Sequence, residues 1–454
     1  MRRPARAFAR LVLTAVSTSV VLALLLSPAT GVAATDPKAE LVARIDSQRD
    51  RLVAMSDWMY LNPEIGHKEF KAVEMLTGYL KENGWEVKVG FSDIAPFWVP
   101  ILERAVGVKE LATAFKATYP GQGDGPTIGI IVEYDALRGP AGSAYHGCQH
   151  NLQAPAGIGA AVALAETMKA RGIPGKVVVF GTPAEEITPP VKAIMWDSGI
   201  FAGVDVMVMF HGSTRTTYQL PGPSMLALDI LEITFKGKPS HAASAPWAGR
   251  SALDAVILFY VGMDQLREHS DPYYRMHGNI TDGGAAPNIV PERAQTVWAI
   301  RHPKRQGVNE QVERVKKIAQ GAAMMTETTV IIDTQGYMDN CLNLSTLENA
   351  AFAYAKSLGA TNIVEPIPGP RMDSASTDFG TVSYNIPSIS LSIQTAPEGT
   401  AGHSQANADA TIADIGHDGM IIASKVEAML AWDLLTQPDY LAKVKAEHAM
   451  LKSQ

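Results

Sequence analysis

Cys148 lies between two histidines, at a spacing that allows a thiolate and an imidazole to bind one metal ion. Residues 145–151 read YHGCQHN, and the only other cysteine among the 454 residues is Cys341. A thiolate and an imidazole two residues apart can reach the same ion, and zinc accepts both ligand types. A disulfide between the two cysteines is the alternative interpretation. The flanking His146 and His150 favour the metal site, whose other ligands must come from elsewhere in the chain.

Further acids and histidines follow the apolar runs that we expect to be strands. These side chains are Glu133, Asp135, Glu185, Glu186, His211 and His403. Each one alone has an ordinary explanation as a solvated or structural residue. In an open α/β sheet, however, the carboxyl ends of the strands form one edge, where ligands bind. Together with Cys148 and His150 these residues form a ligand set that suits zinc, with manganese or cobalt as alternatives.

The elements that must position these side chains are typical of an α/β fold. Apolar, β-rich runs alternate with helical ones, which indicates a sheet of buried, mostly parallel strands. Two helices are expected within 41–84, around Asn62-Pro63, and an alanine-rich helix at 153–171. The expected strands are 127–134, 176–182, 205–211 and 389–393.

The order of elements changes between residues 226 and 339. The pattern predicts strands at 226–235, 274–281, 294–301 and 329–334 and helices at 251–268 and 310–325. This is the β-α-β-β-α-β order of a ferredoxin-like domain, inserted into the α/β domain. The first of its helices is apolar on nearly every side, so we expect it to form part of a subunit interface.

The first 34 residues have the three-part layout of a secretory signal peptide. Four arginines precede an apolar stretch at 11–26, and Val32-Ala33-Ala34 follows as the cleavage site. The apolar stretch is short for a membrane-spanning helix. Without residues 1–34 the chain has 35 basic and 46 acidic side chains, a net charge of −11. We therefore expect a secreted or periplasmic protein, with no membrane anchor after cleavage and no nucleic-acid partner.

Short motifs lie along nearly the whole mature chain. They are LNPEIG at 61–66, EYDAL at 133–137, HGCQHN at 146–151, GTPAEE at 181–186, SHAASAPWAGRSALDA at 240–255, PNIVP at 287–291, STDFG at 376–380 and GHS at 402–404. Together these motifs resemble the M20 metallopeptidase family. The similar branch is that of the amidohydrolases, which includes aminoacylases, hippurate hydrolases, auxin-conjugate hydrolases and p-aminobenzoyl-glutamate hydrolases. The similarity to aminobenzoyl-glutamate hydrolases is greatest at 240–255.

The resemblance implies a catalytic domain at 35–222 and 339–454 with a site for two divalent metal ions. The implied ligands are Cys148, His150, Glu186, His211 and His403. Glu185 would be the general base, which takes a proton from a metal-activated water and passes it to the leaving amine. Asp135 would hold a ligand histidine in place.

The resemblance also implies that the inserted domain, 223–338, acts as a lid and makes the protein a homodimer. His241 and Asn288 would then reach the metal centre of the other subunit and stabilise the oxyanion. Arg301, at the end of a lid strand, is expected to bind the carboxylate of the substrate through its planar guanidinium.

Two features depart from the pattern of the family. Gln149 occupies a position where the family usually has glycine, and we expect its side chain to crowd the metal loop. Residues 93–109, with PFWVP at 96–100, form an insertion. Either this segment shapes an acyl or aryl pocket, or it is a surface excursion packed on the sheet.

The sequence thus predicts a hydrolase that cleaves the amide of an N-acyl or N-aroyl amino acid or a small peptide-like analogue. A dipeptidase or carboxypeptidase with the same two-metal mechanism is the alternative. A secreted binding protein that has lost catalysis is a third interpretation, but such a protein would have no need of the base Glu185.

Overall fold

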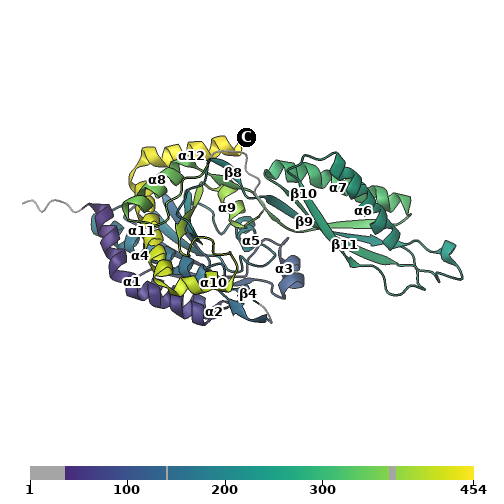
Figure 1. The fold of residues 1–454 in the computed structure, drawn as a ribbon, viewed down its shortest axis with the longest axis horizontal. Coiled ribbons are helices and arrows are strands. Elements are labelled where there is room, and N and C mark those ends of the chain that lie inside the picture. Colours follow the sequence, from purple (N-terminus) through teal and green to yellow (C-terminus); the bar gives the residue numbers. More distant parts are fainter. Residues whose placement is uncertain (1–35, 140–141, 368–374) are drawn as a thin grey trace, which may run out of the picture. The chain divides into compact units, whose positions relative to one another are not determined.

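The computed structural model describes residues 36–454 apart from 140–141 and 368–374 (Figure 1). The predicted signal peptide at 1–34 lies outside the described residues. Residues 37–454 form one compact unit. Across the part of the chain that is described, none of the helices combines the length and the apolar character that a membrane crossing requires.

A six-stranded sheet forms the centre of the catalytic domain, in the order β1–β2–β6–β3–β7–β14. Strands β6, β3, β7 and β14 pair in parallel, whereas β2 runs antiparallel to both of its neighbours. The predicted α/β fold with a mostly parallel sheet is confirmed. The strands are β1 (Glu86–Phe91), β2 (Leu111–Pro120), β3 (Thr127–Val132), β6 (Lys176–Gly181), β7 (Val206–Ser213) and β14 (Ser388–Gln394).

Helices cover both faces of this sheet. Successive side chains of a strand point to opposite faces, so one strand contributes to two apolar clusters. Ile130 of β3 belongs to an apolar cluster with three long helices, whereas its neighbour Ile131 belongs to a second cluster with three short ones. The first set is α1 (Pro37–Leu61), α4 (His150–Arg171) and α11 (Asp414–Thr436). The second set is α3 (Val99–Val106), α5 (Val191–Asp197) and α9 (Phe379–Asn385). Burial on both faces explains why β3 reads as a continuous apolar run.

Four shorter helices complete this domain. They are α2 (Phe70–Glu82), α8 (Ser345–Ser357), α10 (Gln405–Asp409) and α12 (Pro438–Lys452). The two helices expected within 41–84 are therefore α1 and α2. The helix expected at 153–171 begins earlier, at His150, so a predicted metal ligand occupies the first residue of α4.

The inserted domain has the predicted β-α-β-β-α-β order. Its four-stranded antiparallel sheet has the order β10–β11–β9–β12. The elements are β9 (Ala227–Lys236), α6 (Ala252–Glu268), β10 (Arg275–Asp282), β11 (Arg293–His302), α7 (Arg305–Met325) and β12 (Thr329–Met338). Ile257 and Val261 of α6 are 51% and 53% exposed, so this helix has an uncovered apolar face. All six elements fall within 223–338, and the domain boundaries themselves stay a prediction.

Candidate metal centre

The predicted metal ligands lie together beyond the carboxyl ends of the parallel strands. Cys148, His150 and His211 form one group, and Cys148, Glu186 and His403 form a second. Within each group the ligand atoms lie within 4.8 Å of one another. Because Cys148 belongs to both groups, its sulfur is placed where it could serve two ions. The structure thus brings the five side chains together, and their roles as ligands stay predictions.

The loop before α4 presents Cys148 and His150 to the site through an unusual backbone conformation. Gln149, between them, has a φ of 66°, which is in the left-handed region that favours glycine. Its side chain is buried and stabilises this conformation: Nε2 donates to the carbonyl of Asn407 (2.9 Å), and Oε1 accepts from Thr395 Oγ1 (2.6 Å). Gly212 leaves the space that this side chain fills, since a Cβ there would lie 2.1 Å from Gln149 Oε1. The expected crowding of the metal loop is therefore avoided.

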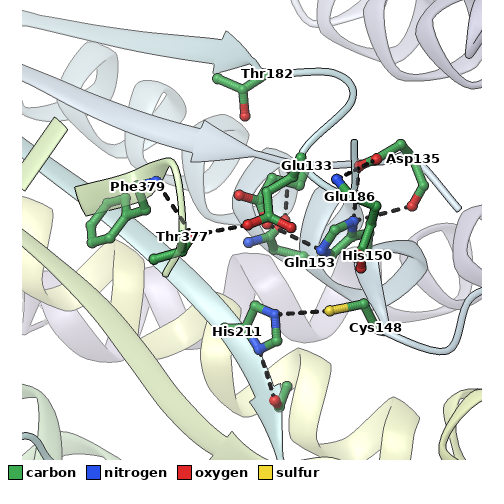
Figure 2. Close-up of polar contacts among 12 residues, drawn as sticks. Glu133, Asp135, Cys148, His150, Gln153, Thr182, Glu186, His211, Thr377 and Phe379 are labelled. Atoms are coloured by element: carbon green, nitrogen blue, oxygen red, sulfur yellow. Dashed lines mark hydrogen bonds and ion pairs between the residues drawn. The ribbon is translucent and has the colours of Figure 1, made fainter. Parts of the chain in front are cut away.

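Both histidines of the first group are held by their Nδ1 atoms, so that Nε2 points into the site. His150 Nδ1 lies 3.0 Å from Asp135 Oδ1 and 3.1 Å from the Asp135 carbonyl. His211 Nδ1 lies 2.9 Å from the carbonyl of Gly212, and its Nε2 faces Cys148 Sγ at 3.5 Å (Figure 2). Such contacts on the far nitrogen fix the ring orientation of metal-binding histidines. Asp135 occupies the position that its predicted role requires.

The adjacent glutamates are oriented by different partners. Ala184, before them, has a φ of 57°, and its N–H donates to Glu69 Oε1 at 2.9 Å. Glu185 Oε1 accepts a hydrogen bond from Thr377 Oγ1 at 2.9 Å. The N–H of Glu186 donates to Asp135 Oδ2 at 3.1 Å, and Glu186 Oε1 lies 3.8 Å from His403 Nε2. The strained turn therefore gives the two carboxylates different partners, Thr377 for one and His403 for the other. Both carboxylates still lie within 4.8 Å of a ring nitrogen of His150.

The last ligand comes from the other end of the chain and is tied to the loop of the first. The N–H of His403 donates to the carbonyl of Gly147 (3.2 Å), and its own carbonyl accepts from Tyr145 Oη (2.5 Å). Asn407 Nδ2 donates to the same Gly147 carbonyl at 2.8 Å. His403 also has a positive φ, 55°. Residues far apart in the sequence are thus held in one small network.

The donor set fits divalent metal ions. His150 Nε2 and Glu186 Oε1 are buried and have no hydrogen-bond partner in the described part of the chain, although such atoms are normally satisfied. Thiolate, imidazole and carboxylate ligands together suit zinc. Neither Cys148 nor Cys341 forms a disulfide in the described part of the chain, which agrees with a metal ligand at position 148.

Burial and neighbouring charges shift the pKa values of three of these ligands. Burial raises the pKa of Cys148 to about 12, so that without metal the thiol keeps its proton. Burial, and then the neighbouring His150, lower the pKa of His211. Burial alone would lower the pKa of His150, but Cys148, Glu133 and Asp135 outweigh it and raise that pKa well above its usual value. Metal binding would therefore release protons from this site.

Beside the predicted ligands lies a buried cluster of charges whose central residue, Lys192, was not predicted from the sequence. Lys192 of α5 is fully buried, and its Nζ lies 2.6 Å from Glu133 Oε1 and 2.6 Å from Asp378 Oδ1. Carboxylate oxygens of Glu133, Asp378 and Glu185 lie within 4.8 Å of one another. Burial alone would raise the pKa of Glu133, but Lys192 and two histidines lower it to about 2. For Lys192 itself, the sequence signal was a single lysine in the apolar stretch PPVKAIM at 189–195.

The predicted lid residues lie apart from this cluster. His241 and Asn288 are exposed and adjacent: the N–H of Ala242 donates to the carbonyl of Asn288 at 2.9 Å. Neither residue lines the cavity at the metal cluster. Arg301 of β11 is partly buried, and its Nη1 donates to Ser376 Oγ at 3.3 Å. Ser376 does line that cavity, so Arg301 lies one contact away from it.

The cavity beside the cluster has a volume of about 930 Å³, enough for a substrate the size of an acylated amino acid. One part of its lining is the predicted site: Glu133, Cys148, Glu185, Glu186, His211 and His403. Another part is apolar: Ala105, Val106, Ile187, Met225, Met338 and Phe379. A charged centre with an apolar wall is the usual composition of a site that binds small molecules.

The fold and the arrangement of the predicted ligands agree with a metal-dependent hydrolase that acts on amide bonds, and comparison with known proteins shows the family. Residues 230–324 match the M20 peptidase dimerisation domain. The chain is 32% identical over 422 residues to the Xaa-Arg dipeptidase of Mus musculus, covering 90% of this chain and 91% of that one. It is 31% identical over 476 residues to one of the subunits of the p-aminobenzoyl-glutamate hydrolase from Escherichia coli K12, covering 89% and 93%.

The chain therefore belongs to the M20 family of metallopeptidases and amidohydrolases. A solved structure has the same fold: the YXEP protein of Bacillus subtilis, described as a dinuclear metal-binding peptidase of the M20 family. Its TM-score is 0.62 at 21% identity, and the match covers 86% of this chain and 99% of that one. The predicted family and fold are confirmed.

Proposed function

We propose that this protein is an exported, homodimeric amidohydrolase that cleaves the amide of N-acyl or N-aroyl amino acids. The proposed substrate class rests on the environment of Arg301. Its Nε is buried without a hydrogen-bond partner among the described residues, and no carboxylate pairs with it in that part of the chain. A half-buried guanidinium beside the cavity, with no carboxylate partner among the described residues, suits a substrate carboxylate, which it can bind with two parallel hydrogen bonds.

The protein's own residues can be assigned to the steps of this reaction. The two metal ions would activate a water molecule and polarise the amide carbonyl. Glu185, whose Oε1 is held by Thr377, is the base for the proton of that water and returns it to the leaving amine. Cys148, His150, Glu186, His211 and His403 would hold the ions. Arg301 fixes the carboxylate, so that the amide is oriented before the reaction begins.

His241 and Asn288 would complete the site from the second subunit. They are exposed on the lid and do not line the cavity of their own chain, so a role at the metals requires another copy. The match of 230–324 to a dimerisation domain supports a homodimer. Inactive His241→Ala subunits mixed with inactive Glu185→Gln subunits should regain activity, because one site in each mixed dimer has both native residues. Mixed dimers that form and stay inactive would contradict this role.

A dipeptidase is the second candidate function, because the mouse relative at 32% identity is an Xaa-Arg dipeptidase. A cationic side chain in the substrate would call for an acid in the pocket. Within the described lining of the cavity, the acids are Glu133, Glu185 and Glu186, which all belong to the charged centre. This composition favours N-acyl amino acids without a cationic side chain.

The decisive experiment is a hydrolysis screen of the metal-loaded protein. The substrates are N-acyl amino acids and dipeptides, each as the free acid and as the carboxamide. We expect free N-acyl amino acids to be cleaved far faster than their carboxamides. Arg301→Ala should narrow that gap by slowing only the free acids, whereas the control Arg293→Ala, on the same strand and paired with Asp282, should not. Equal turnover of acids and carboxamides by the native protein would refute the carboxylate requirement.

Export is proposed from residues 1–34 alone. Expression of the full chain in a bacterial host should yield a mature protein that starts at Thr35, found in the periplasm or medium. Sequencing of its N-terminus and fractionation of the cells measure this directly. An uncleaved protein retained in the cytoplasm would contradict the proposal.

A further inference from the structure

The insertion at 93–109 is firmly anchored, which separates it from an ordinary surface excursion. Trp98 is fully buried, and its Nε1 donates to Asp197 Oδ2 at 2.8 Å. The hydroxyl of Tyr337, in β12, donates to the other oxygen of the same carboxylate at 2.9 Å. The rings of Trp98 and Tyr337 are 5.8 Å apart, and the N–H of Ala95 donates to Ser198 Oγ at 2.9 Å. The segment is thus held between the end of α5 and a strand of the lid.

The residues of helix α3, within this insertion, have several different surroundings. Ile101 and Leu102 are buried in the apolar cluster on one face of the central sheet. Glu103 is exposed and pairs with Lys109 at 3.0 Å. Arg104 pairs with Glu232 of lid strand β9 at 3.2 Å. The last two residues of the helix, Ala105 and Val106, line the cavity that contains the predicted metal ligands.

The end of α3 adds to an apolar wall whose chemistry differs from the rest of the cavity. Met225, Met338 and Phe379 line the same cavity as Ala105 and Val106, and they come from segments far apart in the sequence. A carboxylate cannot be buried against such a wall without a large cost in free energy, whereas an acyl or aryl group gains from it. The carboxylate has its own polar partners, which are Ser376 in the lining and Arg301 behind it. The two ends of an N-acyl amino acid therefore call for different residues of this cavity.

We propose that Ala105 and Val106 of α3 determine specificity for the group on the carbonyl side of the scissile amide, and that this group is an apolar acyl or aryl chain. The inference rests on the proposed function. It adds which part of the substrate, the acyl or aryl group, the insertion contacts. The small side chain of Ala105 leaves room for a chain longer than acetyl. The hydrogen bond of Trp98 to Asp197 holds the insertion, so that the end of α3 does not move aside for a larger group.

The test is Ala105→Trp, with Glu103→Trp as the matched control on the solvent side of the same helix. Ala105 is exposed, so the larger side chain does not need to enter the core. N-acetyl, N-hexanoyl and N-benzoyl forms of one amino acid are compared, and then N-acetyl forms of several amino acids. We expect Ala105→Trp to lower kcat/KM for the hexanoyl and benzoyl substrates, relative to acetyl, by about tenfold or more. Glu103→Trp should leave these ratios unchanged.

Binding of products gives a readout that is independent of turnover. Hexanoate and benzoate should bind the metal-loaded Ala105→Trp protein more weakly than the native protein, whereas acetate should bind both equally. Metal content and melting temperature, measured on each variant, show whether the protein is folded and loaded. Val106→Ala, which enlarges the same wall, should shift the preference toward longer chains.

The inference is overturned if Ala105→Trp lowers kcat/KM equally for all acyl chains. It is also overturned if the loss in kcat/KM varies with the amino acid of the substrate and not with the acyl chain. If the native protein cleaves no N-acyl amino acid, the proposed function fails by itself. The same variants are then compared on the dipeptides that it does cleave, with the N-terminal residue varied from glycine to phenylalanine. A selective loss of the large residues would support the role of α3, and an equal loss would refute it.

Discussion

Replacing Lys192 with methionine should be among the most damaging changes outside the metal ligands. Its ammonium group is fully buried between Glu133 and Asp378, at 2.6 Å from each carboxylate. At an effective dielectric constant of about 20, each contact is worth about 6 kcal/mol of Coulomb energy before desolvation is subtracted. Methionine fills a similar volume but leaves Asp378 without a counter-charge, and it leaves Glu133 with only His150, 3.3 Å away.

The expected net loss is about 3–5 kcal/mol of unfolding free energy, as for other buried pairs that lose one partner. This is a large share of the total of about 5–15 kcal/mol that keeps a protein folded. Denaturant unfolding at neutral pH, with saturating metal and with chelator, measures the loss in both states. Lys169→Met, on the exposed side of α4, serves as the control and should change stability by about 0.5 kcal/mol or less.

A second set of variants separates uncompensated charge from a packing defect. If unpaired carboxylates cause the loss, then adding Glu133→Gln and Asp378→Asn to Lys192→Met should recover most of the stability, because neutral groups of the same shape need no counter-charge. A single variant as stable as the control, or a triple variant no better than the single one, would refute the reasoning.

Three further predictions concern the thiols, the glutamates and pH. Cys148→Ser should lose bound metal and nearly all activity while Cys341→Ser keeps both, as metal analysis and turnover will show; equal losses would remove the cysteine from the ligand set. Glu185→Gln should keep its metal and lose about 10²–10⁴-fold in kcat, whereas Glu186→Gln should bind metal more weakly; the reverse pattern would exchange their roles. Burial raises the pKa of Asp339 to about 6, so the folded state holds a proton that the unfolded state releases above about pH 4. Its contribution to stability should fall as pH rises from about 4 to 6, and Asp339→Asn should remove that slope from unfolding curves.

The elements that position the site could be predicted because their patterns are local. Strands buried on both faces gave uninterrupted apolar runs, and the lid gave alternation with a distinct order of elements. Strands β1 and β2 were missed. The Thr, Lys and Tyr of β2 interrupt its apolar pattern, which reads LATAFKATYP, and the inserted segment separates it from β1. The beginning of α4 at His150 was also missed, because no capping side chain marks it.

The candidate site was predictable where residue type alone carries the chemistry. Thiol, imidazole and carboxylate groups at strand ends indicated the metal cluster directly. Lys192 could not be assigned, because its partners Glu133 and Asp378 come from distant segments and only the fold brings them together. The sequence also could not show that the Gln149 side chain fits without crowding the metal loop. Its contacts to Thr395 and Asn407, about 250 residues away, offset the cost of the strained backbone.

The network that joins the loop of Cys148 to His403 bears on how the protein matures. In the sequence, 258 residues separate Tyr145 from His403, which it contacts directly. Contacts of such long range form late in folding, after shorter loops have closed. A chain still in synthesis or transit therefore has Cys148 and His150 but not the ligand that would complete the second ion's shell. Loading of the second metal would thus mark the finished fold, and until then the thiol would be the group most open to oxidation.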